Sequence, residues 1–468
     1  MNTHFPVVTL VHKIFAFTNY RLRSKLVTMT VKAGVKQLCP SWIKTLAGLV
    51  NRRFDDNARF RVVWLSGARG TGKTTVLRAL RGQYFDCEDP VHWQIQTNPE
   101  RFLSEVERHQ HFIILDEAGA LPDPTRILRE LLRKPSLGVL AVSSSSRLPK
   151  GEFADAIRSK TVSFDWPLPL WSECLDCGSV TPDKLLTSGP FPAVLTGEMP
   201  LKDYYLSWAD TFFARDLQPK RGEWNGVGDF LRFFKAVLQR SGGLLPIEQK
   251  TGRDAVFPPD RLRYGPLKFG ELARATGLTN NVAKSRVEML EECHVVVRVP
   301  ALESGSSADI SSGGKAYVFN PGLVCLANNW AEPTAEAYEV LWRHVVLWHL
   351  RTFVPNVSIR YWERKDRRRR MDFVIQMPND EIHAVRCCWN WTDVRGDFEA
   401  FAGRFPRRRG LNVVVTNDKK HPGILLRNKQ FVMLRDLVEL ESVFEAFPYS
   451  AKNVLAPVER YGLLGGSA

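Results

Sequence analysis

The residues best suited to chemistry lie in a glycine-rich segment, Gly67-Ala-Arg-Gly-Thr-Gly-Lys-Thr74. This spacing is typical of a phosphate-binding loop, in which backbone N–H groups surround the phosphates and the lysine reaches the β- and γ-phosphates. The threonine hydroxyl of such a loop ligates Mg²⁺, so we expect ATP and Mg²⁺ to bind here, with Lys73 as a catalytic residue. The residues expected to contact the nucleotide are Gly67, Arg69, Gly70, Thr71, Gly72, Lys73, Thr74 and Thr75.

A second part of the site is predicted at residues 112–117, FIILDE. Four consecutive apolar residues are typical of a strand buried on both faces of a parallel sheet, whose ligands lie at the carboxyl ends of the strands. We expect Asp116, together with Thr74, to hold the magnesium ion, and Glu117 to activate the attacking water. The acidic pair therefore favours hydrolysis over binding alone.

Five predicted strands position these residues. RVVWL at 61–65 precedes the glycine-rich loop and a helix follows it, which is the order that a phosphate-binding loop requires. The other strands are predicted at 83–86, 112–117, 138–144 and 161–166. The fold class expected is α/β, with a five-stranded parallel sheet followed by a helical region and further domains.

The ordered series of segments resembles a group of AAA-superfamily ATPases of bacteria and archaea. Members of this group pair an N-terminal ATPase with a C-terminal winged helix and a restriction-endonuclease-like domain. The matching segments are GARGTGKTT, YFDCEDP, FIILDEAGALPDPTRILRELL, PLPLWSE, SGPFP and ARDL. The chain departs from the group's pattern at Gly119, where a glutamine is usual, and after Val142, where serines replace Thr-Gly-Ser.

The resemblance implies two further roles in the nucleotide site. Ser143 or Ser144, at the end of the strand predicted at 138–144, would contact the γ-phosphate or the water; a serine-rich turn is the alternative. Arg158 ends a helix predicted at 152–158 and is a candidate arginine finger, which acts on a neighbouring subunit only in a homo-oligomer. An ordinary surface arginine is the other interpretation.

Residues 371–386, MDFVIQMPNDEIHAVR, predict two strands joined by a turn. The resemblance places a nuclease site here, where an Asp on one strand and a Glu and a Lys two residues apart on the next would hold Mg²⁺ and assist the water. Asp372 fits this pattern, whereas Ala384 and Arg386 stand where the Glu and Lys belong. We expect a retained fold with a disabled site; an active nuclease that uses another acid is the alternative.

Residues 266–325 predict a winged helix, with two helices around a Gly277 turn and two strands around a polar loop. Its second helix carries basic residues that could contact phosphates, but glutamates on the same helix favour packing against protein. The candidate nucleic-acid contacts here and in the C-terminal part are Lys284, Arg286, Arg367, Arg368, Arg369 and Arg370.

The composition is consistent with a nucleic-acid partner. A formal charge of +15 and a pI near 9.5 favour binding to a polyanion such as DNA, because basic surfaces release the counterions condensed on phosphates; solvated surface charge is the alternative. No run of eighteen apolar residues predicts a membrane span. Without a credible secretion signal, the eight cysteines are expected to be reduced in the cytoplasm.

Six regions are expected along the chain. They are a basic arm or leader with a first helix (1–54), a P-loop AAA-type ATPase core (55–175), a helical region (176–265), a winged helix (266–325), an inactive nuclease-like domain (330–450) and a tail (451–468). The function expected is ATP hydrolysis coupled to nucleic-acid or partner binding. The alternatives are an active Mg²⁺-dependent DNA nuclease coupled to the ATPase, and a nucleotide-switched scaffold without nucleic-acid binding.

Overall fold

The computed structural model describes much of the chain from residue 61 to residue 445. The residues not described within that span are 80–81, 90–97, 107–111, 122, 135–136, 147–150, 167, 177–179, 196, 218–223, 246–262, 303–312, 355–356, 365, 367–368, 378–380 and 418–430. The predicted arm or leader, the predicted tail, and the candidate contacts Arg367 and Arg368 lie outside the described residues.

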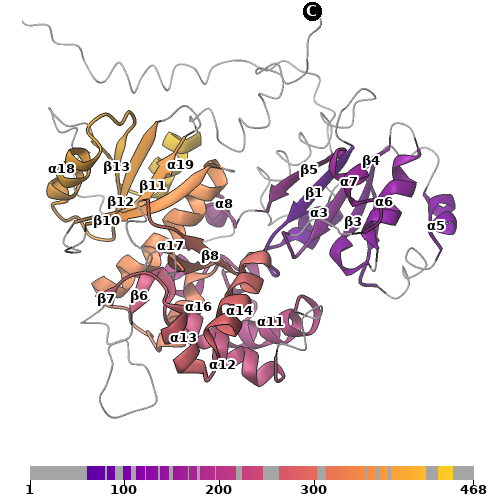
Figure 1. The fold of residues 1–468 in the computed structure, drawn as a ribbon, viewed down its shortest axis with the longest axis horizontal. Coiled ribbons are helices and arrows are strands. Elements are labelled where there is room, and N and C mark those ends of the chain that lie inside the picture. The colour runs from indigo at the N-terminus through magenta and orange to yellow at the C-terminus, as the bar shows by residue number, and fades with distance from the viewer. Residues whose placement is uncertain are drawn as a thin grey trace, which may run out of the picture.

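The first described unit is a sheet of five parallel strands in the order β2-β3-β4-β1-β5 (Figure 1). The strands are β1 (Val62–Ser66), β2 (Gln83–Asp86), β3 (Phe112–Asp116), β4 (Gly138–Ser143) and β5 (Thr161–Asp165). The predicted five-stranded parallel sheet is therefore confirmed. Because all strands run in one direction, their polar last residues come together at one edge of the sheet.

Apolar side chains cover both faces of the sheet at its central strands, which explains why β1, β3 and β4 are almost continuously hydrophobic. The helices beside it are α3 (Lys73–Ala79), α5 (Pro99–Glu105), α6 (Pro124–Leu132) and α7 (Ala154–Arg158). Leu128 and Leu131 of α6 pack in one layer with Trp64, whereas Val76 and Leu77 of α3 pack in the other layer. These two layers hold β1 and β3 rigidly under the loop that follows β1.

A helical region follows the first sheet. It contains α8 (Trp171–Asp176), α9 (Pro182–Ser188), α10 (Pro192–Leu195), α11 (Leu201–Arg215) and α12 (Val227–Leu238). Aromatic side chains join α11 to α12: the ring centres of Trp208 and Phe234 lie 5.6 Å apart, as do those of Phe212 and Phe230. The apolar stripes of these helices are thus core positions, as their three- and four-residue spacing predicts.

Two helices and an antiparallel strand pair occupy the region of the predicted winged helix. They are α13 (Phe269–Thr276), α14 (Asn280–Glu292), β8 (Val296–Val299) and β9 (Lys315–Val318). Gly277 ends α13 in the left-handed conformation at φ 71°, and the Thr279 hydroxyl caps α14 by accepting from the Val282 N–H.

The prediction that Arg286 contacts nucleic acid is wrong. Its side chain is buried, donates to Asp229 of α12 at 2.6 Å, and lies over the Trp224 ring at 3.9 Å. Arg286 therefore links α14 to α12. It is buried because the Asp229 carboxylate, 57 residues away in the sequence, and the Trp224 ring bind its guanidinium group in place of solvent. Lys284 on the same helix remains exposed, 3.9 Å from Glu288.

A second five-stranded sheet lies in the C-terminal part, in the order β10-β11-β12-β13-β14. Its elements are α16 (Pro321–Asn328), α17 (Ala335–Phe353), β10 (Ser358–Glu363), β11 (Arg370–Gln376), β12 (Ile382–Cys388), α18 (Arg395–Arg404), β13 (Asn412–Thr416), β14 (Phe431–Leu434) and α19 (Leu437–Glu445). The sheet is antiparallel from β10 to β12 and parallel from β12 to β14. Helix α17 packs on one face, where the Trp342 indole N–H donates to the Val415 carbonyl, and α18 packs on the other.

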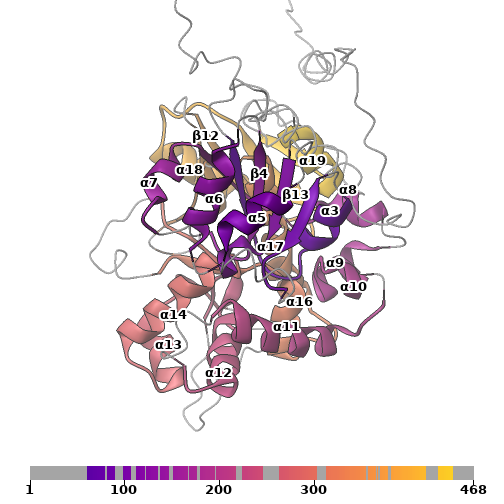
Figure 2. The ribbon, with the colours of Figure 1, turned by 90° about the vertical axis from the view of Figure 1, so that its right-hand side faces the viewer.

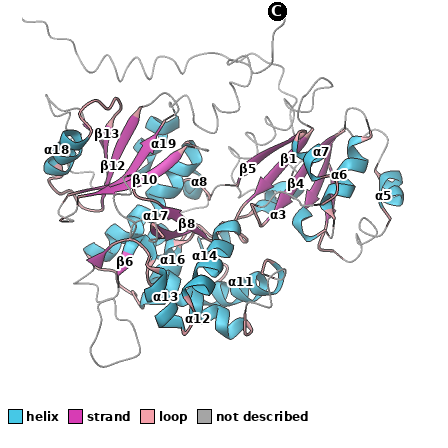
Figure 3. Ribbon diagram, in the orientation of Figure 1, coloured by secondary structure: helices cyan, strands magenta, loops and turns pink. Residues whose placement is uncertain are grey.

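The two sheets lie apart, with helices α11 to α16 and strand β8 between and below them (Figures 1 and 3). The view turned by 90° shows the same helical layer beneath both sheets (Figure 2). Within the described ranges, no helix has the length and apolar character needed to span a bilayer.

Candidate nucleotide-binding site

The loop between β1 and α3 forms a compact turn at the carboxyl edge of the first sheet. Gly70 and Gly72 have φ angles of 84° and 86°, a region that side chains disfavour, so glycine is required by the backbone here. The Lys73 ammonium group donates to the carbonyls of Gly67 and Ala68 at 2.8 and 2.9 Å. The Lys73 side chain is buried, and this burial lowers its pKa.

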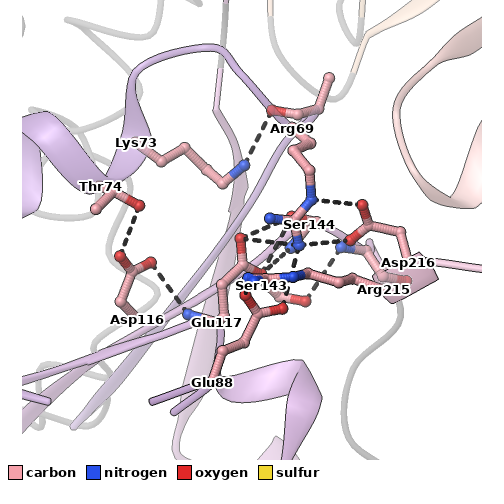
Figure 4. Close-up of polar contacts among 12 residues, drawn as sticks. Arg69, Lys73, Thr74, Glu88, Asp116, Glu117, Ser143, Ser144, Arg215 and Asp216 are labelled. Atoms are coloured by element: carbon pink, nitrogen blue, oxygen red, sulfur yellow. Dashed lines mark hydrogen bonds and ion pairs between the residues drawn. The ribbon is translucent and has the colours of Figure 1, made fainter. Parts of the chain in front are cut away.

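Asp116 lies at the end of β3, directly beside the first residues of α3 (Figure 4). Its Oδ2 accepts hydrogen bonds from the Thr74 hydroxyl at 2.7 Å and from the Tyr84 hydroxyl at 2.8 Å. Burial raises the pKa of Asp116, and the two hydroxyl donors oppose that rise. The structure thus brings together the two residues that the sequence suggested as metal ligands.

Glu117 follows Asp116 with a left-handed backbone, at φ 49°, which turns its side chain away from the strand direction. The Ser144 hydroxyl donates to the Glu117 carboxylate at 2.8 Å, and the Ser144 N–H donates at 3.2 Å. Ser144 is therefore a direct partner of Glu117 across the edge between β3 and β4. An added Cβ at position 119 would lie 2.5 Å from the Ser143 hydroxyl, so a residue larger than glycine there would force that hydroxyl to move.

A charged cluster that the sequence did not reveal surrounds Arg69. Its Nε donates to Asp216 at 2.6 Å, and its Nη2 lies 3.2 Å from Glu88 and 3.7 Å from Glu117 (Figure 4). Arg215 also pairs with Glu88. Burial opposes the charge of Arg69, but the bonded Asp216 and the other carboxylates hold its pKa above the ordinary value. The YFDCEDP and ARDL segments contain these acids, and only the folded chain shows that they meet the loop.

Helix α11 also contacts the backbone of the loop. The Trp208 indole N–H donates to the Arg69 carbonyl at 3.1 Å, and the Tyr204 hydroxyl donates to the Gly70 carbonyl at 3.3 Å. An added Cβ at Gly70 would lie 2.3 Å from the Tyr204 oxygen, so the helix and the loop are in close contact. The conformation of the loop is therefore coupled to the position of α11.

The region after α14 touches the same edge of the sheet. His294 Nε2 lies 3.0 Å from the hydroxyl of Ser66, the last residue of β1, and the Ser146 N–H donates to the Glu292 carbonyl at 2.7 Å. Burial lowers the pKa of His294 to about 4, with Arg351 and Lys73 acting in the same direction and Asp165 opposing them. His294 is consequently neutral at this contact at neutral pH.

We expect His294→Asn to flatten the acid side of the stability curve; asparagine tolerates the left-handed backbone, at φ 58°. Below its ordinary pKa of 6.5, His294 takes up a proton when unfolded but not when folded, so stability falls as the pH falls from 6.5 toward 4. Between pH 7 and pH 5, His294 therefore lowers the free energy of unfolding by about 2 kcal/mol, and the asparagine variant should lack this loss. Urea unfolding at both pH values measures it, and equal pH dependence in the two proteins would contradict the assignment.

Arg158 lies at the other edge of the sheet, where α7 leads into β5. Its side chain is exposed and its Nη1 lies 3.4 Å from Asp155. The backbone carbonyl of Lys160, two residues later, accepts a hydrogen bond from the Val62 N–H at the start of β1. The phosphate-binding loop, in contrast, follows the end of β1. Arg158 therefore lies away from the nucleotide site of its own subunit.

The structure brings together two of the three residues of the predicted degenerate nuclease site. Arg386 of β12 and Asp372 of β11 form a direct ion pair, and Arg386 Nε also donates to Asp397 at 2.9 Å. Although burial opposes it, the guanidinium groups of Arg386, Arg370 and Arg343 hold the pKa of Asp372 well below its usual range. Ala384 is fully buried against α18. The Arg386 guanidinium group thus pairs with the Asp372 carboxylate, which in a nuclease would bind a metal ion.

The other candidate nucleic-acid contacts in this region are partly engaged in ion pairs. Arg369 is exposed and its Nη1 lies 3.8 Å from Asp397. Arg370 lies between Glu339 and Asp372, at 3.6 Å from each carboxylate. Only Arg369 of this pair is accessible enough for a surface contact.

The glycine-rich loop, the helix after it and the Asp-Glu strand beside it define a P-loop nucleotide-binding domain. Residues 59–171 match a family described as an AAA domain, so this part of the chain is an AAA-type ATPase domain, which supports ATP binding. No match was found among curated proteins.

Three solved structures illustrate what the chain is similar to. They are a Walker-type ATPase of Pyrococcus abyssi (11% identity, TM-score 0.34, covering 61% of this chain and 94% of that chain), the RuvB Holliday junction branch migration motor of Thermotoga maritima (17%, 0.28, 57% and 92%) and AMPPCP-bound DnaA of Aquifex aeolicus (12%, 0.28, 55% and 93%).

Proposed function

We propose that the chain hydrolyses ATP at its phosphate-binding loop. The observation that carries this proposal is the position of Glu117, whose carboxylate is held by Ser144 next to the Thr74–Asp116 pair, on the same sheet edge as Lys73. A site for binding alone needs the loop and its lysine. The Glu117 carboxylate is bonded to the Ser144 hydroxyl and the Asp116 carboxylate to the Thr74 hydroxyl, so the two acids have separate partners. A second carboxylate held in this way is suited to activating a water molecule.

The donor set beside the loop fits Mg²⁺. The Thr74 hydroxyl and Asp116 carboxylate oxygens lie 2.7 Å apart, and both are hard oxygen donors of the kind that Mg²⁺ prefers. When bound, Mg²⁺ would neutralise charge on the β- and γ-phosphates. Thr74 and Asp116 would hold it.

The protein's own residues would supply the remaining chemistry. Lys73 would exchange its hydrogen bonds to the Gly67 and Ala68 carbonyls for hydrogen bonds to phosphate oxygens. The buried ammonium group would then be paired with a negative charge. Glu117 would orient the water and take up its proton, and Ser144 would hold Glu117 in place. Arg158 would act on a neighbouring nucleotide in a homo-oligomer.

Nucleotide binding would be coupled to the rest of the chain through contacts with the loop. Arg69 links the loop to Asp216 and Glu88, Trp208 bonds its backbone, and His294 reaches the end of β1. Occupancy of the loop by phosphates would change these contacts and thereby the placement of the helical region and α14.

For the remainder of the chain we propose a winged helix at 266–325 and a restriction-endonuclease-like domain at 330–450, after an ATPase core at 55–175 and a helical region at 176–265. The C-terminal half would bind nucleic acid without cutting it, because Arg386 already neutralises Asp372 and Ala384 offers no ligand. Lys284 and Arg369 are the described exposed candidates for that contact.

A nucleotide-switched scaffold without nucleic-acid binding is the second candidate. The observation that favours it is that Arg286 and Glu292 of α14, and His294 just after it, contact other parts of the same chain. Such a helix serves as a structural connection rather than as a reading element in a groove.

ATP turnover by the purified protein, measured with and without duplex DNA in Mg²⁺ buffer, tests these proposals together. We expect turnover without DNA, stimulation by DNA, and intact DNA at the end of the incubation. Absence of turnover under both conditions would contradict the ATPase proposal. Turnover with no DNA binding would favour the scaffold, and cleavage lost in Asp372→Ala would establish an active nuclease.

A further inference from the structure

Three buried or half-buried cations gather in the C-terminal half, away from the phosphate-binding loop. Lys315 opens β9, Arg343 lies in the middle of α17, and Arg370 opens β11; we call these three residues the Arg343 cluster. The guanidinium carbons of Arg343 and Arg370 lie 4.5 and 5.2 Å from the ring centre of Tyr264. Lys315 Nζ lies 3.9 Å from the carboxylate of Glu363, the residue paired with Arg370 across β10 and β11.

The donors of this cluster are not satisfied by the protein. Arg343 is 1% exposed and Lys315 is 2% exposed. Arg343 Nη1 and Nη2 and Arg370 Nε are buried and have no hydrogen-bond partner among the residues that the structure describes. Arg343 Nε donates to the Glu339 backbone carbonyl at 3.1 Å, which leaves the two terminal nitrogens of a planar fork open.

Two of the nearby carboxylates lie beside members of the cluster: Glu339 is 3.6 Å from Arg370, and Glu363 is 3.9 Å from Lys315. Asp372 is bonded to Arg386 and lies 3.6 Å from Arg370. No described residue accepts a hydrogen bond from the two terminal nitrogens of Arg343, and a buried donor without an acceptor is unfavourable. These two nitrogens are therefore better suited to a state in which a further anion is present.

The cluster keeps its positive charge at neutral pH. Burial lowers the pKa of Lys315 to about 8, against the opposing effect of Glu363 and Asp372, so the amine is still largely protonated. Burial also disfavours the charged form of Arg343, but Tyr264 and Asp372 hold its pKa above the ordinary value. The open N–H donors of Arg343 and Arg370, beside the Lys315 ammonium group, match an oxyanion that has several acceptor oxygens.

We propose that the Arg343 cluster binds one phosphate group, with Arg343 Nη1 and Nη2 as the principal donors. The group could come from free phosphate or from the backbone of a nucleic acid, since both present the same oxygens. Arg370 and Glu339 are partly exposed, so the cluster reaches the surface beside them. The Glu339 carboxylate competes with the incoming phosphate for Arg370. This site is separate from the nucleotide site and does not depend on ATP hydrolysis.

Equilibrium dialysis with radiolabelled inorganic phosphate tests the proposal in a Lys73→Ala background, which removes the phosphate-binding loop as a competing site. We expect one phosphate per chain. Arg343→Met should weaken binding by about tenfold or more, because a charge-assisted hydrogen bond contributes at least 1.4 kcal/mol, roughly a factor of ten. Glu339→Gln should strengthen binding, because it removes the competing carboxylate. Arg364→Met, which removes a more exposed arginine paired with Asp366, is the matched control and should leave binding unchanged.

The opposite signs expected for the two site variants distinguish binding from a structural role, since damage to the fold would weaken binding in both. If Arg343→Met does not fold, Lys315→Met and Glu339→Gln provide the same comparison. No phosphate bound in the Lys73→Ala protein, or equal affinity in all variants, would overturn the proposal. Competition by single-stranded hexathymidylate would identify the nucleic-acid backbone as the source of the phosphate, and binding of phosphate without such competition would support a free-anion site.

Discussion

Replacing Lys73 by alanine is expected to abolish ATP turnover and to weaken nucleotide binding strongly. The Lys73 amine is buried at the centre of the loop and, among the described residues, donates to the carbonyls of Gly67 and Ala68. In the proposed function it is the cation that meets the phosphates from within the loop. Removal of one preorganised cationic donor costs roughly two to three orders of magnitude in rate, so kcat/KM should fall by about a hundredfold or more.

Binding of a fluorescent ATP analogue and release of phosphate measure the two effects of Lys73→Ala separately. Lys160→Ala is the matched control, because Lys160 is an exposed lysine of the same domain, located at the other edge of the sheet. We expect the control to behave as wild type. A Lys73→Ala protein that turns over ATP at the wild-type rate would remove the loop from the catalytic site.

The parts of the nucleotide site that the sequence predicted are those that a short segment specifies by itself. The loop is contiguous, and its glycines are needed at positive φ at Gly70 and Gly72 regardless of the rest of the chain. Asp116 and Glu117 follow a strand whose apolar run already indicates a parallel sheet. Parallel strands end at one edge, so local patterns were sufficient to bring these residues together.

The residues that the sequence did not assign depend on contacts between distant segments. Asp216 is 147 residues from Arg69, and Trp208 is 139 residues from the carbonyl that it bonds. A charge or an aromatic ring on a helix does not indicate its partner until the helices are packed. The position of Arg69 within the loop predicts a contact with the nucleotide, whereas in the structure its side chain is directed to carboxylates on other elements.

Arg286 shows why a basic residue on a helix is weak evidence for a nucleic-acid contact. Its spacing within α14 is compatible with a solvated face, but α12 supplies Asp229 and the nearby Trp224 supplies an aromatic surface. The long arginine side chain gains both packing and an ion pair by burial. In the second sheet, Arg386 likewise pairs with Asp372 in place of solvent, so the hairpin pattern predicted the positions but not the ion pair.

Glu117→Gln is expected to retain ATP binding and to slow turnover by roughly two to three orders of magnitude, which is the usual contribution of a positioned general base. Glutamine has nearly the same shape, and its side-chain oxygen can still accept from the Ser144 hydroxyl, which lies 2.8 Å from Glu117. It cannot take up a proton from water. The loss should therefore fall on kcat, with the dissociation constant for ATP close to that of wild type, which distinguishes it from Lys73→Ala.

Ser144→Ala provides a second variant that tests the same contact. If Ser144 acts only by holding Glu117, its removal should slow turnover in the wild-type protein but have little further effect in Glu117→Gln, because the two residues form one unit. Glu152→Gln, at an exposed acid of the same domain, is the matched control. Wild-type turnover in Glu117→Gln would exclude Glu117 as the base. Additive losses in the double variant would instead mean that Ser144 contacts the phosphate or the water independently of Glu117.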